Sequence, residues 1–170
     1  MELYYSGTTG LIHLLSAFVA LAAGTAVLAM RKGTLRHRQV GWVYALAMAV
    51  LLVTAFMLYN LFGGWGIFHW AAVISSITVL GGMIPIFRRT SKNWVISHFA
   101  FMYWSVFGLY AAFFSEVLTR VPEQPFFGMV GVATFATMGV AGLFWRRYKK
   151  IWAAQFVRER IKPRGPLFRS

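Results

Sequence analysis

The sequence predicts an all-α, polytopic membrane protein with five transmembrane helices. Hydrophobic residues make up 59% of the 170 residues, which is well above the share in soluble globular domains. Five apolar runs are each long enough to cross a hydrocarbon core of about 30 Å, which takes about 20 helical residues. Sixteen of the seventeen Lys and Arg residues fall on one side of these runs, as the positive-inside rule describes for cytoplasmic segments.

The five runs are expected to be helices, because in lipid only helices and closed barrels satisfy all backbone polar groups. The first four should form a four-helix core, and the fifth should lie at its periphery. Residues 1–145 then make a single transmembrane domain. We predict spans at about residues 11–30, 40–62, 67–87, 94–115 and 126–145.

The basic residues predict the orientation of the chain. They lie between the first two spans, between the third and fourth, and after the fifth, whereas Arg120 lies on the opposite side. We therefore expect the N-terminus outside and the C-terminus in the cytoplasm of a multi-pass protein of the bacterial inner membrane. This asymmetry accounts for the net charge of +13, so we expect no nucleic-acid partner. Residues 146–170 are predicted to form a basic, amphipathic cytoplasmic tail on the anionic inner leaflet.

Ionisable side chains within the spans are the candidates for function, because such groups are costly in lipid and face the protein interior or water. The fourth span carries His98 near its start and Glu116 eighteen residues later. This spacing is five helical turns and puts both side chains on one face. The absence of cysteine excludes disulfides, thiolate metal sites and covalently attached haem.

The four histidines sort into two pairs by depth. His13 and His69 begin the first and third spans on the outer side, and His37 and His98 begin the second and fourth on the inner side. In an antiparallel bundle, the first and third helices lie on one diagonal and the second and fourth on the other. Each diagonal should therefore hold two imidazoles at a similar depth, with about 20 Å between the two sites by the helical rise.

Two b-type haems with paired histidine ligands need such a pattern, with each iron held from two facing helices. The pattern is similar to that of the cytochrome b561 fold, whose four core helices hold an inner and an outer haem. This resemblance implies a transmembrane electron carrier, an oxidoreductase whose partner is a quinone or a redox protein. Arg38 would meet the inner propionates, and Gly41, one turn from His37, would leave room for the porphyrin.

Two alternatives remain open. His13, His69 and Glu116 are a His₂Glu set of the kind that zinc or another divalent metal accepts, which would make the chain a membrane metal-site protein or enzyme. In the other alternative, the histidines bond to backbone or headgroups and Glu116 pairs with Arg120 four residues on. The chain would then be a cofactor-free subunit of a homo- or hetero-oligomeric membrane complex.

Two stretches carry a motif that joins the second span to the fourth: HRQVGWVY, residues 37–44, and HFAFMYWSVFGLYAAFFSEVLTRVP, residues 98–122. They resemble a bacterial family of small predicted membrane proteins that is described as a domain of unknown function. The resemblance covers about residues 10–122 and implies an integral membrane protein without an assigned activity. The motif positions are His37, Arg38, Gly41, Tyr44, His98, Met102, Ser105, Glu116 and Arg120.

Overall fold

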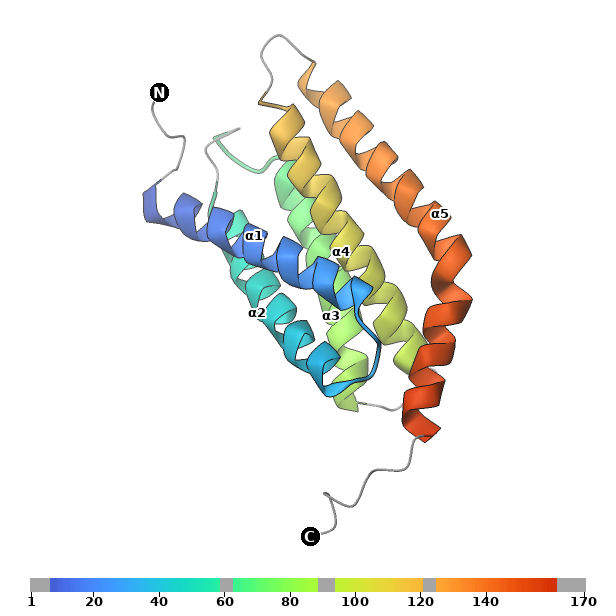
Figure 1. The fold of residues 1–170 in the computed structure, drawn as a ribbon. Helices are drawn as coiled ribbons and strands as arrows, with labels where there is room; N and C mark the ends of the chain where they lie inside the picture. The colour runs from blue at the N-terminus through green and yellow to red at the C-terminus, as the bar shows by residue number, and fades with distance from the viewer. Residues whose placement is uncertain (1–6, 59–62, 89–93, 121–124, 162–170) are drawn as a thin grey trace.

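The structure, a computed structural model, describes residues 7–58, 63–88, 94–120 and 125–161, without the side chains of residue 153 and residues 155–161. Each helix in it is long and apolar enough to cross a membrane, so the chain is a multi-pass membrane protein, as predicted. The described residues form α1 (Gly7–Ala29), α2 (Leu35–Met57), α3 (Ile67–Arg88), α4 (Trp94–Leu118) and α5 (Phe126–Ile161) (Figure 1).

The first four helices form an antiparallel bundle, and α5 lies outside it against α4 (Figure 1). The main contacts join α1 to α2, α3 to α4 and α4 to α5, with smaller ones between α2 and α3 and between α1 and α4. Within the described ranges, no close backbone contact joins α1 to α3 or α2 to α4, so these pairs are the diagonals of the bundle. The predicted four-helix core with a peripheral fifth helix is therefore confirmed.

Thr34 is the N-cap of α2, as its residue type and position in the sequence predict, so the helix begins five residues before the apolar span predicted at residue 40. Gly33 has a φ of +81°, a left-handed conformation that glycine adopts at little cost. The hydroxyl of Thr34 then accepts a hydrogen bond from the backbone N–H of His37 at 3.2 Å and caps the new helix. As a result α2 covers Leu35–Met57, while residues 59–62 of the predicted span lie outside the described part of the chain.

The core of the bundle is packed where α1, α2 and α4 meet. Tyr44, Met48 and Val106 are almost completely buried there. Gly24 of α1 allows the close approach, because a Cβ at this position would meet the Tyr44 ring at 3.0 Å and Val106 at 3.2 Å. Small residues serve the same purpose at many interfaces between membrane helices, where van der Waals packing is the main attraction.

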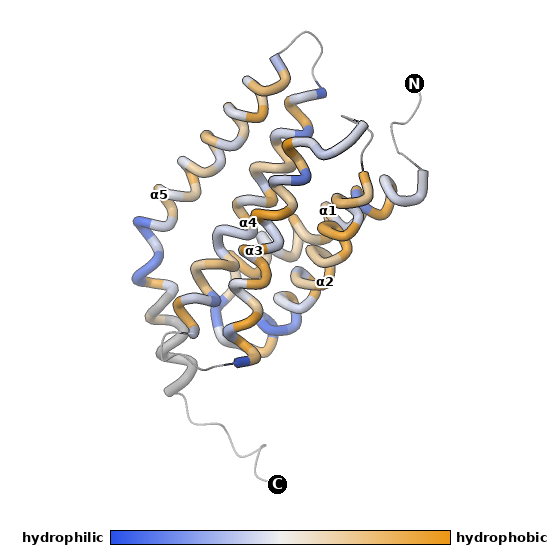
Figure 2. The backbone as a smooth tube through the Cα atoms, turned by 180° about the vertical axis from the view of Figure 1, so that it is seen from behind, coloured by the Kyte–Doolittle hydropathy of each residue, from blue (hydrophilic) through white to orange (hydrophobic). Residues whose placement is uncertain are grey.

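Helix α5 does not stop at the predicted boundary near residue 145. It runs unbroken from Phe126 to Ile161, a length of about 54 Å at the standard rise per residue. Figure 2 shows its hydrophilic stretches toward the end of the bundle at which the C-terminus lies. The first part of the predicted tail is therefore a continuation of the membrane helix, whereas residues 162–170 lie outside the described residues.

The orientation across the membrane stays a prediction, and reporter fusions test it. A reporter that is active only outside the cytoplasm should be active when it is fused after Gly64 or Gln124, and silent after Lys32 or Lys92, because the basic segments stay in the cytoplasm. A fusion after residue 170 is a further control and should also be silent. Activity of the Lys92 fusion would put His69 and His98 on swapped sides and so contradict the predicted pairs.

Candidate functional site

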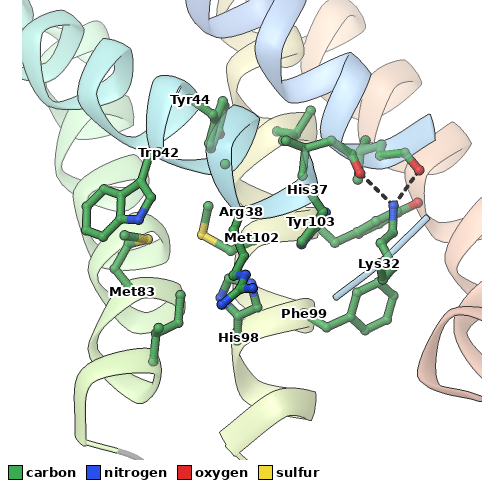
Figure 3. A pocket seen from close by; sticks show the side chains of 15 residues that line it. Lys32, His37, Arg38, Trp42, Tyr44, Met83, His98, Phe99, Met102 and Tyr103 are labelled. Carbon is green, nitrogen blue, oxygen red and sulfur yellow. Dashed lines mark hydrogen bonds between the residues drawn. The ribbon is translucent and has the colours of Figure 1, made fainter. Parts of the chain in front are cut away.

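A pocket opens between α1, α2, α3 and α4 in the half of the bundle where α2 and α4 begin (Figure 3). Its cavity has a volume of about 120 Å³, and the atom-free space reaches about 780 Å³ when the open mouth is included. Most of its surface is apolar, with a few polar groups that converge on it, as in typical ligand sites. Six of the motif positions line the pocket: His37, Arg38, Gly41, Tyr44, His98 and Met102.

The helical repeat explains why these motif residues gather. On α2, His37, Gly41 and Tyr44 follow one another at intervals of four and three residues, which keeps them on one face. His98 and Met102 share a face of α4 in the same way. A seventh motif residue, Ser105, joins the two faces, because its hydroxyl is hydrogen-bonded to the buried hydroxyl of Tyr44. Seven of the nine motif positions therefore describe one site between α2 and α4, the two helices on one diagonal of the bundle.

His98 is held in a defined orientation by the backbone of α3. Its Nδ1 lies 2.8 Å from the carbonyl oxygen of Gly82, and a carbonyl only accepts, so Nδ1 carries the proton and Nε2 carries the lone pair of the neutral ring. Gly82 permits this contact, because a Cβ there would meet Met102 Sδ at 2.5 Å and the backbone nitrogen of Met102 at 3.3 Å.

His37 lines the same cavity from α2. It lies in the first turn of the helix and is buried. One turn further on, Gly41 leaves space in the pocket wall, since a Cβ at that position would meet no atom within 4 Å. The structure thus brings the two histidines of the predicted inner pair, together with Arg38 and Gly41, to one pocket.

Lys32 is a residue of this pocket that sequence reasoning did not single out. It is only 2% exposed, and its ammonium donates hydrogen bonds to the carbonyl oxygens of Val27 and Leu28, both at 2.6 Å (Figure 3). A third hydrogen bond, of 3.2 Å, goes to the carbonyl oxygen of Met30. Burial lowers the pKa of Lys32 to about 8, so the side chain is mostly protonated at neutral pH. A lysine just beyond the end of an apolar helix is the signal that points to such a role.

Aromatic side chains of α5 support the α4 wall of the pocket. Trp145 stacks on Phe99, with 5.0 Å between ring centroids, and contacts Tyr103 at 4.9 Å. The Tyr103 hydroxyl donates a hydrogen bond of 2.6 Å to the carbonyl oxygen of Ala141. Further along α5 than Trp145, the ring of Trp152 lies 5.7 Å from Lys32 Nζ, within the range of a cation–π contact. Helix α5 therefore belongs to the pocket through its contacts with Phe99, Tyr103 and Lys32.

The two histidines of the predicted outer pair, His13 and His69, form hydrogen bonds with different partners. His13 Nδ1 lies 3.0 Å from the hydroxyl oxygen of Thr54. That hydroxyl donates its proton to a carbonyl of its own helix, so it accepts from His13. His69 Nδ1 accepts a hydrogen bond from the backbone N–H of Gly66 at 3.1 Å, which places the proton of the neutral ring on Nε2. The His69 ring also stacks on Trp65 at 4.9 Å.

The outer metal site is not assembled. Among the residues that the structure describes, no three His, Asp or Glu side chains come together as a metal ion would require, so His13, His69 and Glu116 do not form the His₂Glu set considered above. Glu116 instead accepts a hydrogen bond of 2.6 Å from Arg120 in an exposed ion pair. The predicted pairing of Glu116 with Arg120 is thereby confirmed.

Comparison with known proteins supports the membrane assignment and the extent of the motif. The model of a family described as predicted membrane protein (DUF2306) matches residues 10–145. The match extends past residue 122, where the resemblance seen in the sequence ends, and includes α5 up to residue 145. No curated protein and no solved structure matches the chain significantly. Since the family model covers most of the chain, the protein belongs to the DUF2306 family of predicted membrane proteins.

Proposed function

We propose that this chain is a membrane redox protein that holds one haem b in the pocket described above, here named the inner pocket. His37 and His98 would be the ligands of its iron. The observation that supports the proposal is that two histidines from diagonally opposite helices line one cavity. Haem iron with two histidine ligands is held from two facing helices in the same way. The bound haem would supply one-electron oxidation and reduction.

The surroundings of the two histidines suit this ligand. The hydrogen bond from His98 Nδ1 to Gly82 leaves the lone pair on Nε2, which is how protein backbones orient ligating histidines. Apolar side chains such as Met83 and Phe99 line the wall, where a porphyrin face would lie. Arg38 lines the same pocket and is exposed at the protein surface, so it would meet propionates at the mouth of the pocket.

The size of the pocket sets how a porphyrin would enter. A cavity of about 120 Å³ is smaller than the ≈ 300–1,000 Å³ of pockets for drug-sized ligands. The larger space of about 780 Å³ includes open solvent at the mouth, so a porphyrin needs the mouth as well as the cavity. Gly41 would add room for a haem, since the space beside it is open, and Arg38 at the pocket lining would hold its propionates.

The proposal contains one haem and not two. An outer haem would require His69 to give up the bond that its Nδ1 accepts from Gly66, or to lose the proton from Nε2. The pocket geometry therefore favours a carrier that passes electrons on the cytoplasmic side of the bacterial inner membrane, with a quinone or a redox protein as its partner. The two-haem transmembrane carrier stays a prediction.

The visible spectrum of the purified full-length protein tests this proposal. We expect a Soret band and, after reduction, a sharp α-band of low-spin haem, either as purified or after addition of haemin to the protein in detergent. The low-spin signature is expected because two imidazoles, those of His37 and His98, would hold the iron. A folded protein that is colourless and gives no such spectrum with haemin would contradict the proposal and favour the cofactor-free subunit.

A further inference from the structure

The charged side chains that line the inner pocket are all basic. The described lining residues include Lys32 and Arg38 and contain no Asp or Glu. The whole chain has four acidic residues, and Glu116, the one among the motif positions, binds Arg120 near the opposite end of α4. A buried charge is costly unless an opposite charge or well-placed acceptors offset it. The pocket itself supplies no carboxylate for this purpose.

The fold holds the charge of Lys32 at the wall of this pocket. Gly33, with its φ of +81°, turns the chain back after α1, and Lys32 Nζ reaches the carbonyl oxygens of Val27, Leu28 and Met30. These oxygens lie at the C-terminal end of α1, where the helix dipole is negative. They satisfy the N–H donors of the ammonium, yet they carry only partial charge. A ligand carboxylate would add a full opposite charge at the same place, which the partial charges of the carbonyls do not supply.

We propose that Lys32 and Arg38 form the anion-binding end of the inner pocket, and that its ligand carries at least one carboxylate on a planar, apolar body. The apolar part would lie against Trp42, Met83 and Met102, which line the same pocket. This inference rests on the pocket of the proposed function and names the chemistry of its ligand. It does not depend on iron, since the two basic residues recognise the carboxylate and the two histidines would hold the metal.

Iron-free protoporphyrin IX, a dicarboxylate, and its neutral dimethyl ester separate the two contributions. Binding to the full-length protein in detergent is measured by quenching of tryptophan fluorescence, since Trp42 lines the pocket. Both porphyrins partition into micelles, so the ratio of ester Kd to acid Kd is compared between protein variants. We expect wild-type protein to bind the acid more tightly than the ester, and Lys32→Met to lower that ratio at least about tenfold, as the loss of a charged hydrogen bond predicts.

Two further variants make this result specific. Arg38→Met should also lower the ratio, and since Arg38 is exposed the change leaves the core intact. Arg36→Met is the matched control: it removes the same charge from the first turn of α2, at an exposed position outside the pocket lining, and should leave the ratio unchanged. If Lys32→Met fails to fold because α1 loses its capping bonds, Arg38→Met and Lys32→Arg decide, the latter retaining the acid preference.

The outcomes separate this inference from the haem proposal. Equal ratios in wild-type, Lys32→Met and Arg38→Met protein would overturn the inference, and so would a wild-type protein that binds neither porphyrin or binds both equally. If haemin gives no low-spin spectrum while the acid preference depends on Lys32 and Arg38, the haem proposal fails and the anion-binding end stands. Low-spin haem together with an unchanged ratio would reject the anion-binding end alone.

Discussion

Replacing either His37 or His98 with alanine should abolish low-spin haem binding, and replacing both should remove little more than either single change. Each iron needs both axial imidazoles for the low-spin state, so the two residues act as a unit and their effects are not additive. The measurements are the reduced α-band and the haem content per protein, in membranes and after purification. Both histidines line one pocket, so a local loss of the cofactor is expected without loss of the fold.

The outer histidines are the matched controls for this result. His13→Ala and His69→Ala should leave the inner haem unchanged. These side chains bind Thr54 and Gly66, which lie at the end of the bundle away from the inner pocket. If these two changes together remove a second spectral component, the outer haem is present and the two-haem carrier is correct. An equal loss of cofactor for all four single changes would contradict a site built from His37 and His98.

Gly82→Ala should lower the free energy of unfolding by about 1 to 3 kcal/mol, the cost of inserting a methyl group into a packed interface. The new Cβ would lie 2.8 Å from Met102 Cγ and 3.3 Å from the Met102 backbone nitrogen. The methionine side chain can move, but the backbone nitrogen moves only if α3 and α4 separate. That separation would also stretch the hydrogen bond between Gly82 and His98. Denaturant titration in mixed micelles, followed by circular dichroism, measures the change.

Gly41→Ala is the matched control, as it adds the same methyl group to a helical glycine of the same site. Its Cβ would meet no atom within 4 Å, and alanine has a helix propensity better by about 1 kcal/mol than glycine. The variant should therefore be as stable as the wild-type protein or more stable. A loss of stability as large as that of Gly82→Ala would show that the close approach of α3 to α4 is not the cause.

The motif positions form one site only when α2 and α4 face each other across the bundle. Seven of the nine residues, from His37 on α2 to Ser105 on α4, meet at one pocket or at the hydrogen bond beside it. The spacing within each helix is visible in the sequence, because 3.6 residues per turn decides which side chains share a face. The remaining two, Glu116 and Arg120, pair with each other at the far end of α4.

The sequence by itself determined the features that depend on local chemistry or on the thickness of the bilayer. Run length and apolar composition predicted five membrane helices, the residue type of Thr34 predicted the cap of α2, and a spacing of four predicted the pair of Glu116 with Arg120. Antiparallel order along the chain was enough to place the first and third helices, and the second and fourth, on diagonals, as found.

Only the tertiary structure decided which side chains meet. The outer histidines begin two diagonal helices just as the inner histidines do. His69 nevertheless binds its own helix start at Gly66, a choice that depends on ring orientation and not on depth. The burial of Lys32 depends on the carbonyl oxygens and the Trp152 ring around it. A flexible side chain after a helix end can reach either solvent or the bundle, and the packing of α1, α4 and α5 selects between them.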